Sequence, residues 1–540
     1  MLKMAAPALQ SLISLGQFSS LTEQVLVAAI AAVLVAVLIN LRRKPKFDLD
    51  KIPGPWTHAY PVVGNILECL RPDFHRKLLD WANQYGGIYR LKFLWQDALV
   101  VSDPAALAAI MGRGEGAMDK AALVYAPINR MCTPHGDANL LTSAADESWK
   151  AIRKAVAVSF SMQNIRKKFP LVLGRINQLI ARLEALGPDV AVDVDQAALR
   201  VTLDVIGLAG FNHDYDCVSQ DVPAYDHLIR VLPRCFTEVM LRIANPLREM
   251  FPGQHRNGPK GAAAFKMFQA EMGVLLRELK QRGAPDPDDQ DIATQLCRVL
   301  QQHPDIPESR VLSEIGILFV EGFETTGHTT SWTLFNIASV PGVQAKIGEE
   351  LDCLGLLAKP GCPPPRELEW EDLKQLPYLI AATKEAMRML PVVSVMGRVA
   401  GKDMSVGPYK VPAGTVVGTP LFAIQNSSHN WDRPEEFIPE RWLDVPVESY
   451  VYDSTSHTSG GKRGITFMPF SEGPRNCVGQ SLAKMEVLSL LAKLCANFEI
   501  ALAPEMGGRE GVRSRESTHL TLQTAGTKGI RCHLHPRARA

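Results

Sequence analysis

The sequence feature that most constrains the fold is a loop around Cys477 that reads FSEGPRNCVG and leads directly into a segment of helical periodicity over residues 480–497. A sulfur at the start of a helix is favoured as the thiolate, because the helix dipole and the free backbone N–H groups stabilise an anion. Arg475 adds a nearby cation. The pattern predicts a thiolate ligand, although a buried structural role is the commoner fate of a lone cysteine.

Three further residues give this loop a specific pattern. Gly473 and Gly479 are expected to let the backbone approach the sulfur and a bound group closely, and Phe470 is expected to pack beside the ligand. Together with Arg475 and Cys477 they match every fixed position of F-x-x-G-x-R-x-C-x-G. On these residues the chain resembles the cytochrome P-450 family from about residue 50 to its end.

The resemblance implies a fold, a cofactor and a reaction. The cofactor would be haem b, iron protoporphyrin IX, with Cys477 as the axial thiolate and metal ligand and with Arg475 near a haem propionate. The reaction would insert one atom of O2 into a hydrophobic substrate and reduce the other to water, with electrons from NADPH.

Helical periodicity dominates from about residue 145 to 390, and the clearest long helix is expected over 312–340. The fold class is therefore mainly α with minor β, here the cytochrome P-450 fold, in one large catalytic domain over 57–540. Lysine and arginine total 58 against 57 acidic residues, so a nucleic-acid partner is not expected. The short strand-like segments are 88–93, 98–102 and 410–419, the last of which contains a Pro-Ala-Gly turn.

The N-terminal region contains an apolar run long enough for a spanning helix. We predict a transmembrane anchor over 25–41, after a lumenal segment 1–24 and before a basic, proline-rich hinge over 42–56. The basic hinge and the scattered cysteines without a CxxC pair favour a cytosolic catalytic domain at the endoplasmic reticulum membrane. A cleaved signal peptide and plastid targeting are the alternatives.

Three residues match the family's propionate partners. Trp149 and Arg153 have the W-x-x-x-R spacing, which places both on one face of a helix, and Arg398 matches a third partner. Cations and N–H donors suit a partly buried dianion. On its own, the first pair is also typical of a core tryptophan beside a surface arginine.

Another pair is expected to have a structural role. Glu385 and Arg388 are three residues apart and share a helical face, and the resemblance adds Arg441 to close a Glu-Arg-Arg cluster. Buried charges must be paired, so this cluster would hold the core around the haem loop.

The long helix contains the sequence EGFETT over 321–326, where two threonines and a glycine are unfavourable for a helix. The hydroxyl of Thr325 can bond the carbonyl one turn earlier and loosen the helix, so that a groove for O2 opens beside Gly322. By resemblance, Thr325, Glu324 and Thr326 manage proton delivery during oxygen activation. The alternative is a kinked packing helix.

Glu321 departs from the Ala or Gly that most of the family carries, and a carboxylate facing an apolar haem pocket is costly. The fatty-acid ω-hydroxylase branch carries the same E-G-x-D/E-T-T pattern, and there the glutamate forms an ester with a haem methyl. We therefore predict a covalent Glu321–haem ester and a fatty acid or related lipid as substrate. A glutamate that turns toward water or arginine is the alternative.

No P-loop or dinucleotide fingerprint is evident, so a separate NADPH-dependent flavoprotein reductase at the membrane is the expected partner. Its docking face would lie near Cys477, with Lys462, Arg463 and Lys484 as candidates. Two other functions share the Cys477 loop: a haem-thiolate isomerase or dehydratase of lipid hydroperoxides, and a haem-binding sensor without turnover.

Overall fold

The computed structural model describes residues 47–58, 63–93, 96–114, 116–219, 223–245, 248, 258–281, 289–444, 464–525 and 529–537. The chain divides into two compact units, residues 1–51 and 52–540. In the first, the described part is a short 3-10 turn, η1 (Leu49–Lys51). The predicted segments 1–24 and 25–41 and the start of the hinge lie outside the described residues. Within the described ranges, none of the helices has the length and apolar character needed to cross a membrane.

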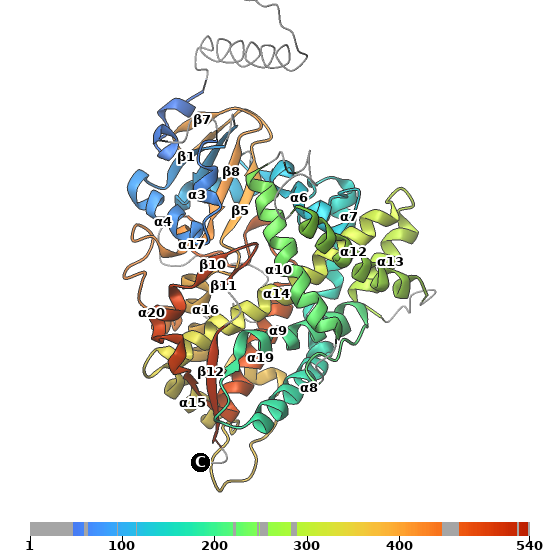
Figure 1. Cartoon of the computed structure of the whole chain (residues 1–540), viewed down its shortest axis with the longest axis vertical. Coiled ribbons are helices and arrows are strands. Elements are labelled where there is room, and N and C mark those ends of the chain that lie inside the picture. Colours follow the sequence, from blue (N-terminus) through green and yellow to red (C-terminus); the bar gives the residue numbers. More distant parts are fainter. Residues whose placement is uncertain are drawn as a thin grey trace, which may run out of the picture. The chain divides into compact units, whose positions relative to one another are not determined.

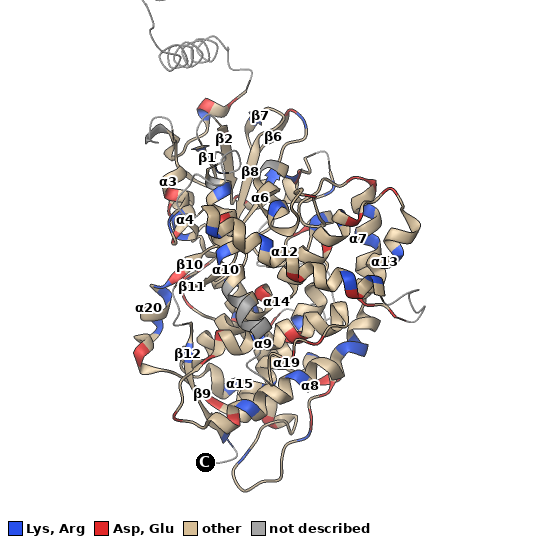
Figure 2. Cartoon of the chain, turned by 45° about the vertical axis from the view of Figure 1, so that its right-hand side comes forward, with Lys and Arg blue, Asp and Glu red and all other residues tan. Residues whose placement is uncertain are grey.

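The second unit is mainly helical, as predicted, with charged residues of both signs interspersed along its helices (Figure 2). The predicted helix over 480–497 is confirmed as α19, whereas the long central helix, α14, begins four residues earlier than predicted, directly after Pro307. The helices (Figure 1) are α3 (Ile66–Cys69), α4 (Phe74–Tyr85), α5 (Pro104–Met111), α6 (Ala122–Cys132), α7 (Glu147–Ser159), α8 (Met162–Leu186), α9 (Val194–Val205), α10 (Pro223–Ala244), α12 (Gly258–Gln281), α13 (Ile292–Gln302), α14 (Glu308–Ser339), α15 (Val343–Cys353), α16 (Pro377–Met389), α17 (Leu421–Asn426), α19 (Gln480–Asn497) and α20 (Gly508–Arg513).

The largest sheet has the strand order β1-β2-β8-β5-β3 and is antiparallel except for the parallel pair β2–β8. Its last pairing places Lys120 directly opposite Arg398, so two cations lie side by side at one edge. The strands of this sheet are β1 (Ile88–Phe93), β2 (Gln96–Val101), β3 (Asp119–Lys120), β5 (Val395–Val399) and β8 (Val416–Pro420).

Three smaller sheets complete the β structure. The predicted strand-like stretch over 410–419, with its Pro-Ala-Gly turn, consists of two strands of different sheets, β7 and β8, on either side of Gly414 (φ 82°). The small sheets are β4 (Val192–Asp193) with β12 (Arg531–Pro536) and β9 (Phe498–Leu502), β6 (Met404–Val406) with β7 (Tyr409–Val411), and β10 (Glu516–Thr518) with β11 (Leu522–Thr524).

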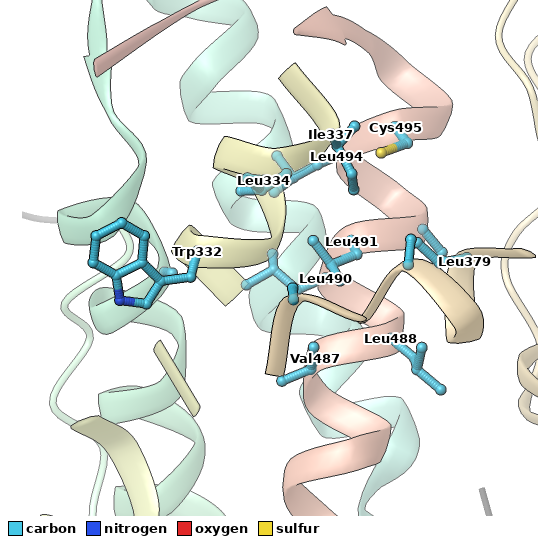
Figure 3. Packing of buried hydrophobic residues seen from close by; sticks show 14 of the residues in the cluster. Trp332, Leu334, Ile337, Leu379, Val487, Leu488, Leu490, Leu491, Leu494 and Cys495 are labelled. Carbon is cyan, nitrogen blue, oxygen red and sulfur yellow. The ribbon is translucent and has the colours of Figure 1, made fainter. Parts of the chain in front are cut away.

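Helix α14 joins the two main apolar clusters of the core. Its first half, including Phe319 and Phe323, packs with α6, α10, α12 and α13. Its last turns, including Trp332 and Leu334, pack with Leu379 of α16 and with α19 (Figure 3). The middle of α14 is therefore held between two rigid clusters, and there a cavity opens.

Candidate active site

The cavity is lined by the middle of α14, the Cys477 loop and the start of α19, together with parts of α6, α7, β5 and the β10–β11 turn. About 1870 Å³ of space in it is free of protein atoms, including the part open to solvent. Much of the lining is aliphatic, with Ile128, Leu140, Ile206, Leu318 and Met396 as examples. Such a lining suits a hydrophobic ligand.

The Cys477 loop is closed by a backbone hydrogen bond in which the N–H of Cys477 donates to the carbonyl of Phe470 at 2.8 Å. Phe470, Cys477 and Gly479 line the cavity, as predicted. Gly473 does not line the cavity, so its approach to a bound group stays a prediction, but its backbone does make a close contact. It has φ 73°, and a Cβ there would lie 1.9 Å from the backbone oxygen of Met111, so this glycine makes room for a neighbouring carbonyl.

The protein does not ionise the sulfur of Cys477 by itself. Burial, and next the negative charge of Glu321, raise the pKa of this thiol to about 11. The N–H of Gly479 and the charges of Arg153 and Lys484 act in the opposite direction and lower this pKa. A buried thiol of this kind loses its proton to a bound metal, which is the behaviour expected of a metal ligand.

The prediction that Lys484 belongs to a reductase docking face is wrong. Its side chain is 3% exposed and its ammonium lies 5.4 Å from the centre of the Phe470 ring, so it faces the cavity and cannot form part of a reductase docking surface. The other two docking candidates, Lys462 and Arg463, lie outside the described residues.

Arg475 and Arg153 both line the cavity near the sulfur. Arg475 donates to Asp119 Oδ1 at 2.8 Å and lies over the Trp149 ring at 4.2 Å, while burial lowers its pKa to about 10. Arg153 donates to Asn476 Oδ1 at 2.8 Å. The indole N–H of Trp149, predicted to meet a propionate, donates instead to the carbonyl of Leu140 at 2.9 Å.

Lys120 is a site residue that the sequence analysis missed. It is 6% exposed, lines the cavity and faces the buried Arg398 across the β3–β5 pair. Burial and the charges of Arg398 and Arg475 lower the pKa of Lys120. Arg398 itself does not line the cavity; its Nη2 lies 3.5 Å from Ser471 Oγ.

This accumulation of cations fits the haem that the family resemblance implies. Like charges placed opposite each other in a sheet destabilise it unless an anion compensates them. Lys120, Arg153 and Arg475 line the cavity, and among the described residues Asp119 is the carboxylate paired with this group. Two further carboxylates, as in haem propionates, would balance these charges.

On α14, Thr325 Oγ1 donates to the carbonyl of Glu321 at 2.8 Å, as predicted, and Thr326 Oγ1 lies 3.4 Å from that of Gly322. The helix nevertheless continues unbroken from Glu308 to Ser339, so the expected loosening is absent here. A carbonyl oxygen has two lone pairs and can accept both an N–H and a hydroxyl.

Gly322 has a packing role beside its place in the lining. A Cβ there would lie 2.5 Å from Ile206 Cδ1, in the π-helical turn η3 (Ile206–Gly210) that packs against α14. Glu324 and Thr326 also line the cavity, and both are buried. The structure therefore brings together the cysteine loop and, except for Phe323, the residues of the EGFETT motif around one cavity.

Glu321 extends into the cavity, where part of its surface is exposed although it lies deep within the protein. Burial raises the pKa of its carboxyl group. The charge of Lys120 lowers this pKa and that of Glu324 raises it further. The positive charge of Lys120 therefore acts on the Glu321 carboxylate, which remains part of the cavity lining.

Glu385, Arg388 and Arg441 form the predicted cluster, and none of the three lines the cavity. The sequence analysis did not include Trp442, whose indole N–H donates to Glu385 Oε2 at 3.0 Å. In the sequence, the position of Trp442 directly after Arg441 was the feature that could have indicated its part in the cluster.

Comparison with known proteins supports one family. A family model described as cytochrome P450 matches residues 53–521. The chain is 26% identical over 467 residues to the chloroplastic carotene epsilon-monooxygenase of Arabidopsis thaliana, a match that covers 83% of this chain and 80% of that protein. It is 25% identical over 531 residues to cytochrome P450 3A6 of Oryctolagus cuniculus, with coverage of 95% and 98%. It is 27% identical over 511 residues to geranylhydroquinone 3''-hydroxylase of Arnebia euchroma, with coverage of 91% and 96%.

Proposed function

Because the chain belongs to the cytochrome P450 family and is a monooxygenase, we propose that it inserts one oxygen atom of O2 into a lipid-like substrate, with electrons passed from NADPH by a separate flavoprotein reductase. One observation carries this proposal: an aliphatic cavity is lined both by Cys477 and by Glu324 and Thr325 of α14. The cysteine loop alone would also suit a haem sensor, which has no need of the acid and hydroxyl.

In this proposal Cys477 holds the haem iron, while Lys120, Arg153 and Arg475 hold the propionates, with Arg398 as a charge behind them. Bound haem would supply the activation of O2 and the one-electron transfers. The aliphatic lining excludes bulk water and orients an apolar substrate. Trp149 supports the site through its ring beneath Arg475.

Glu324 and Thr325 handle protons in this proposal. Glu324 lines the cavity, and its buried Oε2 has no hydrogen-bond partner among the described residues, so this oxygen can hold a proton for transfer. The Thr325 hydroxyl directs its hydrogen to Glu321, which leaves its oxygen free to accept one. Thr326 supports this turn of α14 through its own hydroxyl.

We further propose a fatty acid or related long-chain lipid as substrate and an ester between Glu321 and the haem. The support is the EGFETT motif and a Glu321 side chain that extends into the cavity. For location we propose the endoplasmic reticulum membrane, through the apolar segment 25–41. A plastid is the alternative, and three of the similar proteins carry the word chloroplastic in their names.

Turnover with a reductase tests the function. The purified protein, with an NADPH-dependent flavoprotein reductase and a panel of fatty acids, should consume NADPH and O2 in equal amounts and yield a hydroxylated product. Thr325→Ala should consume both but release hydrogen peroxide instead. Turnover of lipid hydroperoxides without NADPH or O2 would contradict the proposal and favour an isomerase or dehydratase.

A further inference from the structure

Helices α9 and α14 pack closely against each other at Gly327. A Cβ at this position would lie 2.7 Å from Leu199 Cδ2 and 3.2 Å from Leu199 Cα. The next residue, His328, is 2% exposed and lies beside Asp195, at the start of α9. Close packing thus places a buried histidine between two helices, one turn after Glu324.

Both ring nitrogens of His328 face carboxylates. Nδ1 lies 2.8 Å from Asp195 Oδ1, and Nε2 lies 3.5 Å from Glu324 Oε1, a distance typical of a charge contact. An ionised carboxylate can only accept, so a ring that serves two of them carries a proton on each nitrogen. Burial lowers the pKa of His328, but Asp195 and then Glu324 outweigh it and raise this pKa to about 10.

Asp195 is itself held firmly. Ser331 Oγ donates to Asp195 Oδ1 at 2.6 Å, from the next turn of α14. Burial raises the pKa of Asp195, but His328 and Ser331 more than offset this, and the pKa is lowered. Asp195 and His328 therefore form an ion pair that joins the two helices before any substrate binds.

The pair acts on the two oxygens of Glu324 differently. Oε1 faces the imidazolium, whereas Oε2 is buried and lacks a hydrogen-bond partner within the described part of the chain. Glu324 lines the cavity and His328 does not. His328 can therefore influence events in the cavity only through Glu324.

We propose that His328, held as an imidazolium by Asp195, is a positioning residue for monooxygenation that binds one oxygen of Glu324 and thereby keeps the other available in the cavity. This inference rests on the proposed function. During proton delivery Glu324, a carboxylate at rest, takes a proton from water on Oε2, and this Oε2–H bond breaks again when the proton passes into the cavity. His328 keeps both of its protons throughout, because Asp195 stabilises the cation.

The first experiment measures coupling, the amount of product formed per NADPH consumed. His328→Gln and Asp195→Asn should each lower coupling about tenfold, below the range of roughly 10²–10⁴ attributed to a direct proton donor. In a Glu324→Gln background, adding His328→Gln should cause no further loss, because the histidine acts through that carboxylate. An additional loss in the double variant, or unchanged coupling in the single variants, would overturn the proposal.

The second experiment measures the protonation state of His328 in the absence of turnover. In protein with ¹⁵N-labelled histidine, one ring should carry protons on both nitrogens from pH 6 to 9. That signal should vanish in His328→Gln, persist in His535→Gln, an exposed control, and become neutral in Asp195→Asn. A neutral His328 ring at pH 7 in an active enzyme would refute the inference alone. A protonated ring in a protein that consumes neither NADPH nor O2 would refute the proposed function instead.

Discussion

Arg388 and Glu385 form a two-pronged ion pair in α16 in which neither side chain is exposed to solvent. Arg388 Nε lies 2.9 Å from Glu385 Oε2, and Nη2 lies 2.9 Å from Oε1. Arg441 Nε also donates to Oε1, at 3.2 Å. Arg388 Nη1 donates at 2.9 Å to the carbonyl of Gln425, so the pair ties α16 to α17.

Removal of one partner should be far more costly than the same change at the surface. Glu385→Ala would leave two guanidinium groups without their carboxylate, and we expect a loss of about 3–5 kcal/mol in the free energy of unfolding. The matched control is Glu147→Ala in α7, which breaks the pair with Lys150 at the same i,i+3 spacing but on the surface. Similar unfolding midpoints in denaturant for both variants would contradict this prediction.

Gly473→Ala should destabilise the cysteine loop. The new Cβ would meet the Met111 carbonyl at 1.9 Å, and φ 73° is strained for alanine, so a cost of about 1–3 kcal/mol or more is expected. Gly348→Ala in α15 is the control, because nothing lies within 4 Å of its Cβ and alanine favours a helix by up to about 1 kcal/mol. The two variants should shift the unfolding midpoint in opposite directions.

Cys477→Ser should remove the thiolate signature of the reduced, carbon monoxide-bound protein, because a hydroxyl does not replace the sulfur as an anionic ligand. Cys353→Ser, at an exposed cysteine, should retain it. A thiolate band in the first variant would show that another cysteine is the ligand.

Asp193→Asn should stabilise the protein increasingly as the pH rises from about 4 to 6, with the full effect above pH 6. Burial, and then Asp195, raise the pKa of Asp193 to about 6, so the folded state favours the protonated form. The stability that this group contributes is complete below its ordinary pKa of 3.8 and is lost as the pH rises through 6. Asparagine is never charged and still caps α9.

The variant should therefore exceed the wild type by about 1–3 kcal/mol at pH 7 and match it near pH 4. Denaturant unfolding at several pH values measures this difference. Asp103→Asn, at the N-cap of α5, controls for the exchange of the capping group. A constant difference from pH 4 to 7 would contradict the prediction.

Acidic organic extraction tests the proposed ester. After turnover, the haem of the wild type should stay with the denatured protein, whereas Glu321→Gln should release it into the solvent. Glu147→Gln, an exposed carboxylate of α7 outside the cavity, should retain the haem as the wild type does. Complete release from the wild type would show that Glu321 forms no ester.

Local patterns predicted the elements better than their contacts. Helix α19 and the Glu385–Arg388 spacing follow from side-chain periodicity along one segment, and both are found in the structure. Lys484 was assigned wrongly, and the contact of Gly473 with Met111 was not predicted, because the atoms that surround these residues, Met111 oxygen and the Phe470 ring, are set by the folding of the whole loop.

The sequence by itself determined the family, the mainly helical character and the cysteine loop, because these depend on residue types at short, fixed spacings. Only the tertiary structure decided that Lys120 faces Arg398 across a strand pair and that His328 meets Asp195 from another helix. The physical reason is that these contacts depend on strand register and on helix packing at Gly327, which bring together residues far apart in the chain.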